Sequence, residues 1–160
     1  MAALTEFQLP EVCELRQVSA AELDRLLEEE TAVWQQDLAW DFRPSAKLVR
    51  RFVQMQSLNG FALRAENGLV GYAYQVCDER KGLIGDFYVK PSAQSPSNEL
   101  SLLGAIVQSL MRTPGVRRIE SQLMLIRTPL TQPLPFSSYL TRHDRHFMRA
   151  AASSIGALEE

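Results

Sequence analysis

The residues that could carry chemistry begin with an acid inside an apolar segment. Asp86 lies within Leu83–Val89, a run whose composition predicts a β-strand. A carboxylate in such a strand is either a functional acid–base group or half of a structural ion pair with an arginine, because both produce the same sequence pattern. Glu79 and Glu120 are weaker candidates for the same role.

A polar segment that follows this strand could bind an anion. Residues 91–98 read Pro-Ser-Ala-Gln-Ser-Pro-Ser-Asn, and Ser95 with Pro96 forms a good N-cap and first-turn pair for the amphipathic helix that comes next. Loop amides together with a helix N-terminus make a cluster of N–H donors that suits a pyrophosphate. The alternative is an ordinary helix cap.

A metal site has little support. His143, Asp144 and His146 could share one helix face, but two histidines without further ligands fall short of the four that a closed zinc site needs. The arginines around them favour a solvated basic face. We therefore expect no metal.

The elements that must position these residues mix helices and strands. The expected order is strand, helix, helix, three strands, loop, helix, strand, loop, helix. The main signals are a strand at Val12–Val18, a capping box at Ser19–Glu22, a hairpin turn at Asn67–Gly68 and a strand at Val116–Ile126. In the first helix, residues 28–30 are expected on the solvent side. The order predicts a single α/β domain (α+β, with a mixed sheet).

Composition narrows the class of protein. The chain has 160 residues, a net charge of -2 and 46% hydrophobic residues, which excludes a disordered chain and argues against a strongly basic nucleic-acid binder. No apolar stretch approaches the roughly 20 residues of a membrane span. Cys13 and Cys77 are interpreted as reduced thiols of a cytoplasmic protein.

Charge is spread unevenly. Residues 1–41 hold ten acids and two bases, a net charge of -8, while residues 112–149 hold seven arginines and two acids, a net charge of +5. These segments are either two solvated faces that attract each other, or an acidic wall for a cationic substrate and a basic wall for a phosphorylated one.

The stretch Leu69–Ile126 resembles the GNAT superfamily of N-acetyltransferases. In that family a strand with a Leu-Tyr-Val-like run precedes a proline, and a loop of pattern R/Q-x-x-G-x-G/A leads into an amphipathic helix. Here the strand is Asp86–Pro91 and the loop aligns as Gln94–Glu99. Gln94 keeps the first position, whereas Ser97 and Glu99 replace the two small residues.

The resemblance implies a GNAT-like acyl-CoA N-acyltransferase fold and an N-acetyltransferase that moves an acetyl group from acetyl-CoA, its cosubstrate, to a primary amine of a small molecule or peptide. It implies that Asp86 is the base and that Tyr139 donates a proton to the departing thiolate. The residues that it assigns to coenzyme A, along the strand and then the loop, are Phe87, Tyr88, Val89, Gln94, Ser95, Ser97 and Asn98.

Three matters stay open at this point. Ser97 restricts close backbone approach and Glu99 would repel a pyrophosphate, so the alternative is a non-catalytic GNAT-like binding or regulatory module with weakened coenzyme A binding. A third possibility is an unrelated small α+β binding domain.

The aromatic residues of the first two helices and the hairpin either line an acceptor pocket or belong to the core; they are Trp34, Trp40, Phe42 and Tyr72.

The number of residues after the last predicted strand bears on whether the chain contains a complete GNAT-like domain. Residues 127–160 number 34, and a Pro-rich loop takes nine of them, which leaves room for a helix and about one strand, where the family needs a helix and two. We therefore expect that part of the C-terminal strands is missing from this GNAT-like domain of residues 1–160. The chain would then be the N-terminal part of a longer protein, or would borrow a strand from a second copy in a homodimer.

Overall fold

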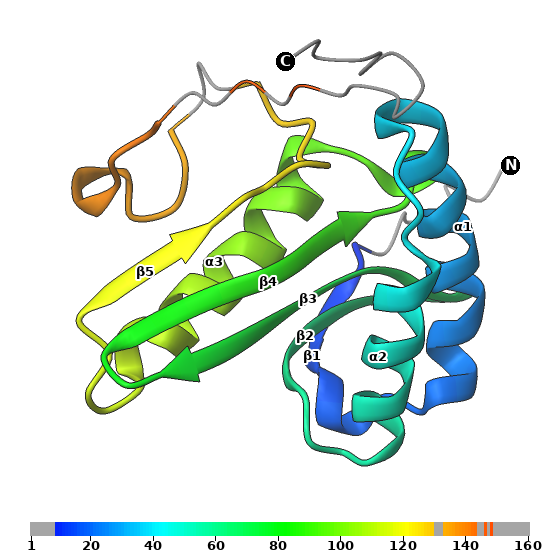
Figure 1. Cartoon of the computed structure of the whole chain (residues 1–160), viewed down its shortest axis with the longest axis horizontal. Helices are drawn as coiled ribbons and strands as arrows, with labels where there is room; N and C mark the ends of the chain where they lie inside the picture. The colour runs from blue at the N-terminus through cyan, green and yellow to red at the C-terminus, as the bar shows by residue number, and fades with distance from the viewer. Residues whose placement is uncertain (1–8, 130–132, 144–145, 147, 149–160) are drawn as a thin grey trace, which may run out of the picture.

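The computed structural model describes residues 9–129, 133–143, 146 and 148, and places five strands of these residues in one sheet. The order across the sheet follows the chain: β1 (Glu11–Glu14), β2 (Asn59–Ala65), β3 (Gly68–Asp78), β4 (Lys81–Val89) and β5 (Arg118–Ser121). The first four strands run antiparallel to their neighbours, and β5 runs parallel to β4 (Figure 1). The predicted mixed sheet is confirmed.

Two local signals produce the elements that the sequence predicted. Gly68 has φ +110 at the turn between β2 and β3, a conformation that glycine adopts readily. The Ser19 hydroxyl accepts a hydrogen bond from the N–H of Glu22, whose carboxylate accepts from the N–H of Ser19. This capping box starts α1 (Ala20–Leu38) as predicted.

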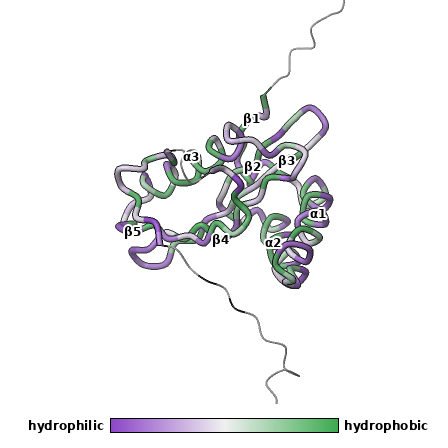
Figure 2. Tube along the Cα trace, turned by 90° about the horizontal axis from the view of Figure 1, so that it is seen from above, coloured by the Kyte–Doolittle hydropathy of each residue, from purple (hydrophilic) through white to green (hydrophobic). Residues whose placement is uncertain are grey.

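The helices cover both faces of the sheet. Helices α1 and α2 (Arg43–Gln54) lie on one side, and α3 (Pro96–Arg112) lies on the other (Figure 2). Each side has its own hydrophobic core: Leu23, Leu27 and Tyr72 belong to the first, and Phe87 and Ile106 to the second. The sheet therefore presents alternate residues of each strand to different helices.

Two predicted strands are shorter than expected. The segment Val12–Val18 forms β1 only to Glu14, after which the 3-10 turn η1 (Leu15–Gln17) buries Leu15. The segment Val116–Ile126 pairs only over β5, because the chain bends away after Ser121. The last helix is predicted over residues 136–152; of these the structure describes 136–143, 146 and 148, and in them it shows only the short turn η3 (Ser137–Tyr139). Within the described part of the chain, no helix is long and apolar enough to cross a membrane.

Candidate active site

Asp86 owes its direction to an extra residue in β4. Tyr74 pairs with Asp86 and Gln75 pairs with Ile84, which leaves Gly85 as a bulge between them. A Cβ on Gly85 would lie 2.1 Å from the Tyr74 ring, so this position excludes a side chain. Bulges redirect the side chains that follow them, and here Asp86 faces α1.

The Asp86 carboxylate belongs to a buried cluster of three oxygen-bearing side chains, Glu30, Tyr72 and Asp86, called here the carboxyl cluster. The Tyr72 hydroxyl oxygen lies 2.7 Å from Glu30 Oε2 and 2.9 Å from Asp86 Oδ2. Trp34 Nε1 donates to Glu30 Oε1 at 3.1 Å, and the N–H of Phe87 donates to Asp86 Oδ1 at 2.8 Å. Every carboxyl oxygen of the cluster therefore has a partner.

Burial dominates the electrostatics of the carboxyl cluster. It raises the pKa of Asp86, and it raises the pKa of Glu30 further with the help of the nearby Asp86 charge. Burial and both carboxylates also raise the pKa of Tyr72. Among the described residues no lysine, arginine or histidine pairs with Glu30 or Asp86. The expectation of an Asp86–arginine ion pair is thus not met.

Glu30 was not predicted as a site residue, and its predicted solvent exposure was wrong. Its exposed fraction is 0%. The signal that could have identified it is its spacing, since Glu30 lies three and four positions after Leu27 and Leu26, which are on the apolar stripe of α1. An acid at such a position needs buried polar partners, and β3 and β4 provide them.

Half of the β4 edge that faces β5 carries no strand. The two strands pair only over Lys81–Ile84 and Arg118–Ser121. The N–H of Lys90 bonds to Val70 on the β3 side, and because N–H groups alternate along a strand, those of Phe87 and Val89 point to the open edge. The side chains of Phe87, Tyr88 and Val89 are buried in the two cores, so these residues face the edge with their backbone; the N–H of Phe87 is taken by the Asp86 carboxylate, and that of Val89 has no partner among the described residues.

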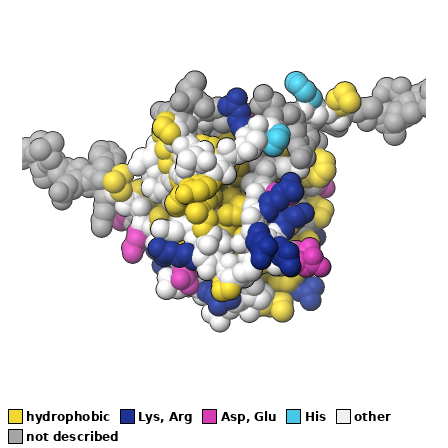
Figure 3. All heavy atoms as spheres, turned by 90° about the vertical axis from the view of Figure 1, so that its left-hand side faces the viewer, with side chains coloured by type: hydrophobic (Ala, Val, Ile, Leu, Met, Phe, Trp, Pro, Cys, Tyr) yellow, Lys and Arg dark blue, Asp and Glu magenta, His cyan; other side chains and the backbone are white. Residues whose placement is uncertain are grey.

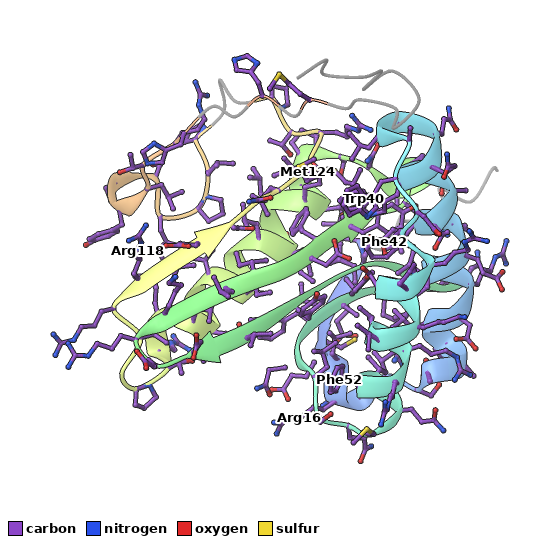
Figure 4. All side chains as sticks on the ribbon, in the orientation of Figure 1. Arg16, Trp40, Phe42, Phe52, Arg118 and Met124 are labelled. Carbon is purple, nitrogen blue, oxygen red and sulfur yellow. The ribbon has the colours of Figure 1, made fainter. Side chains whose placement is uncertain are left out.

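The segment after β5, Gln122–Thr128, is called here the strap. Met124 and Leu125 pack on the α1 side of the sheet, while Leu123 and Ile126 pack on the α3 side, which places the strap beside the open edge of β4. Figure 4 shows Met124 at the same end of the sheet as Trp40 and Phe42. No backbone hydrogen bond of the described residues joins the strap to Gly85–Val89.

Two acids hold the strap. Glu99, with 1% of its surface exposed, accepts hydrogen bonds from the N–H of Arg127 (2.9 Å), the N–H of Thr128 (2.5 Å) and the Thr128 hydroxyl. Arg127 also forms an ion pair with Asp37 near the end of α1. Glu99 therefore binds the strap, and this differs from the expected role in which its carboxylate opposes a pyrophosphate at the helix start.

The loop before α3 uses most of its N–H donors internally. The N–H groups of Ala93 and Gln94 bond back to Lys90 and Pro91 in the turn η2 (Pro91–Ala93). The Ser95 hydroxyl accepts from the N–H of Asn98, whose side-chain amide donates to Ala93. Pro96 has no N–H to offer, so of the loop residues assigned to coenzyme A, Ser95 and Ser97 keep N–H groups without a described partner.

The structure does not bring Tyr139 to Asp86. Tyr139 is 79% exposed in η3, beside β5 and away from α1 (Figure 1). The hydroxyl of Tyr88 is closer in the fold, because Tyr88 lies two residues after Asp86 on the same face of β4. This buried hydroxyl has no hydrogen-bond partner among the described residues.

The aromatic residues considered for an acceptor pocket divide between core and surface. Trp34 stacks on Phe42 with ring centroids 5.2 Å apart, Tyr72 is fully buried, and Trp40 is 60% exposed. His143 and His146 are exposed, Asp144 lies outside the described residues, and the described residues contain no group of three potential metal ligands.

Five of the ten acids of the N-terminal segment form ion pairs. Its pairs with basic residues are Glu22–Arg64, Asp24–Arg50, Arg25–Glu29, Asp37–Arg127 and Asp41–Arg43. Figure 3 shows Lys and Arg side chains gathered beside an apolar hollow at the β5 end of the molecule. The Asp37–Arg127 pair joins the acidic and basic segments directly, as expected for two solvated faces that attract each other.

Comparison of the sequence with protein-family models and with curated proteins gives no match. Solved structures do match. A GCN5-related N-acetyltransferase from Ralstonia eutropha superposes with a TM-score of 0.60 at 13% identity, and the match covers 88% of this chain and 98% of that one. The chain has the GNAT fold. A predicted acetyltransferase from Clostridium acetobutylicum, solved with acetyl-CoA, gives a TM-score of 0.59 at 10% identity and covers 93% of this chain and 100% of that one.

A third structure with the GNAT fold is AAC(6′)-Iy in complex with the bisubstrate analogue CoA-S-monomethyl-acetylneamine. Its TM-score is 0.55 at 13% identity, and the match covers 90% of this chain and 99% of that one. At such identities the likeness establishes the architecture, and it confirms the predicted GNAT-like fold. The roles of individual residues rest on the geometry described above.

Proposed function

We propose that this GNAT-fold chain is an acyl-CoA-dependent N-acetyltransferase that acts on a primary amine. The observation that carries the proposal is the open edge of β4. This edge begins after Ile84, where the Gly85 bulge directs the Asp86 carboxylate, so the carboxylate and the open edge lie next to each other. An unpaired strand edge can pair with an extended amide-bearing chain such as the pantetheine arm of coenzyme A. The neighbours solved with acetyl-CoA and with a coenzyme A analogue support this choice of cosubstrate.

The reaction needs a base, a donor to the carbonyl oxygen and a proton for the thiolate. In our proposal the amine nitrogen attacks the thioester carbon while Asp86 takes the amine proton. The N–H of Val89, which points to the open edge, donates to the developing oxyanion. The C–S bond then breaks and the thiolate takes a proton, for which the Tyr88 hydroxyl is better placed than Tyr139.

The acceptor is proposed to be a small-molecule or peptide amine. AAC(6′)-Iy was solved with the bisubstrate analogue CoA-S-monomethyl-acetylneamine, which supports an amine acceptor for this chain. Asp86 is the residue to which we assign the binding of the acceptor's ammonium group. Half of the acids of residues 1–41 are paired with arginines, so we assign the N-terminal segment no role in binding the amine.

The test measures thiol release from acetyl-CoA in the presence of a panel of primary amines. We expect transfer to at least one amine and a loss of about 10²–10⁴-fold in Asp86→Asn, the usual contribution of a positioned base. Asp78→Asn, which changes an exposed acid at the end of β3, is the matched control and should retain activity. Absence of heat and of thermal shift with millimolar acetyl-CoA would refute the proposal.

A second candidate is a non-catalytic binding or regulatory module. It is favoured by the loop before α3, where the N–H groups of Ala93, Gln94 and Asn98 are bonded within the loop and few N–H donors remain for a pyrophosphate. It predicts that the parent chain does not bind acetyl-CoA and that Ser97→Gly gains binding by allowing closer backbone approach. Glu99→Gly is a poor variant for this purpose because Glu99 holds the strap.

A further inference from the structure

The carboxyl cluster contains more hydrogen-bond acceptors than its visible donors can serve. The Tyr72 hydroxyl has one proton, yet its oxygen lies within hydrogen-bond distance of one carboxyl oxygen from α1 and one from β4, at 2.7 and 2.9 Å. If both carboxyls were ionised, the hydroxyl could donate to only one of them, and the other contact would be between two acceptor oxygens. One further proton is needed to make both contacts hydrogen bonds.

We propose that Glu30 carries this proton at neutral pH and donates it to the Tyr72 oxygen, while the Tyr72 hydroxyl donates to an ionised Asp86. The arrangement satisfies every atom. Glu30 Oε1 accepts from Trp34, Glu30 Oε2–H donates to Tyr72, and Asp86 Oδ1 accepts from the N–H of Phe87. The cluster then has one negative charge, located on Asp86.

The surroundings favour the proton on Glu30 and not on Asp86. Glu30 is fully buried and receives one N–H bond, from an indole, whereas Asp86 accepts a backbone N–H and the Tyr72 hydroxyl and lies at the sheet edge. The titratable groups that face Glu30 are Tyr72 and Tyr74 from β3 and Asp86 and Tyr88 from β4. None of them is a base that could neutralise an ionised Glu30.

The consequence for catalysis rests on the proposed function. Glu30 is a positioning residue, because it touches Tyr72 and acts on Asp86 through that hydroxyl. When Asp86 takes a proton from the amine, both carboxyl groups of the cluster are protonated. The thiolate takes its proton from the Tyr88 hydroxyl, and transfer of the proton from Asp86 to the Tyr88 oxygen then restores both groups, so that protons balance over one turnover. The presence of the proton on Glu30 does not depend on activity.

The test is infrared difference spectroscopy of the whole protein at pH 7, in which a protonated carboxylic acid gives a C=O stretching band distinct from that of a carboxylate. We expect one such band in the parent, its loss in Glu30→Gln and its retention in Asp86→Asn. Glu28→Gln, an exposed neighbour on α1, is the control and should keep the band. A parent without the band, or a band that survives in Glu30→Gln, would overturn the proposal.

Folding of the variant provides a second readout. Glutamine imitates a protonated glutamate, since its amide donates to Tyr72 and its oxygen accepts from Trp34. We therefore expect Glu30→Gln to melt within a few degrees of the parent at pH 7, whereas Glu30→Leu, which removes both bonds, melts clearly lower. Equal losses in the two variants would contradict a protonated Glu30. Neither measurement requires acetyl transfer, so this inference and the proposed function fail separately.

Discussion

The contact between Glu99 and the strap allows a quantitative prediction. Glu99 is buried in the first turns of α3, and its two oxygens accept three hydrogen bonds from Arg127 and Thr128. Glu99→Gln keeps the size of the side chain but exchanges one acceptor oxygen for an NH₂ group. That NH₂ group must face at least one strap N–H, because both oxygens of the glutamate are in use.

The expected cost follows from the bonds that remain. A buried N–H left without an acceptor costs about 1–3 kcal/mol, and a hydrogen bond to a charged group contributes about 1.5–3 kcal/mol. Because glutamine retains one neutral acceptor, only part of both costs applies. We expect the free energy of unfolding to fall by about 2–4 kcal/mol. Glu99→Ala, which removes all three bonds, should lose more.

Urea unfolding of the parent and of both variants measures this loss. Hydrogen exchange at the amides of Arg127 and Thr128 should accelerate more than exchange in the sheet, because these amides lose their acceptor. Glu28→Gln is the matched control, since the same chemical change occurs at an exposed position. A Glu99→Gln value within about 0.5 kcal/mol of the parent, the range of ordinary surface substitutions, would refute the reasoning.

Three further outcomes follow from the structure. Gly85→Ala should destabilise by about 1–3 kcal/mol in urea unfolding because its Cβ meets a tyrosine ring, whereas Gly104→Ala, with no atom closer than 3.7 Å, should stabilise α3 by up to about 1 kcal/mol; a neutral Gly85→Ala would contradict the bulge. Burial raises the pKa of Glu30 above its ordinary value of 4.5, so the stability that protonated Glu30 contributes is complete below pH 4.5 and is lost as the pH rises through the pKa of the folded protein. The melting temperature of Glu30→Gln should therefore depend less on pH in that range than the melting temperature of the parent. Parallel curves of melting temperature against pH would contradict a raised pKa of Glu30. Asp37→Asn removes the exposed ion pair of the strap and should cost about 0–1 kcal/mol in unfolding, so a larger loss would show that this contact is more than a surface pair.

Local signals predicted most of the architecture. The capping box at Ser19 and the turn at Asn67–Gly68 act within a few residues, so the sequence alone identifies them. The end of β5 could not be predicted, because the apolar residues after Ser121 suit a strand as well as a segment that packs on both cores. Alternation along the chain does not distinguish these two cases.

The site was predicted only in part for a related reason. Asp86 was identified through the resemblance of its strand to the GNAT pattern, but the residues that hold it are a tyrosine 14 residues before it and, through that tyrosine, a glutamate a further 42 residues back. Glu99 was interpreted through a loop motif, whereas its partners lie 28 and 29 residues later. A buried acid reveals its role through such distant donors, which periodicity and motifs do not include.

The strap and the loop before α3 both affect whether coenzyme A can reach the open edge of β4. The strap lies beside the open edge of β4, and Glu99 ties it to the helix whose N-terminus would receive a pyrophosphate. A ligand that pairs with Phe87–Val89 must therefore displace the strap or pass beside it, and the observed affinity falls in proportion to the fraction of molecules in which the edge is accessible. Since the same carboxylate stabilises the fold and restrains the strap, substitutions at Glu99 would change stability and access together. Asp37 contacts the strap through Arg127 and belongs to neither core, so we expect Asp37→Asn to change access to the edge with little change in the stability of the fold.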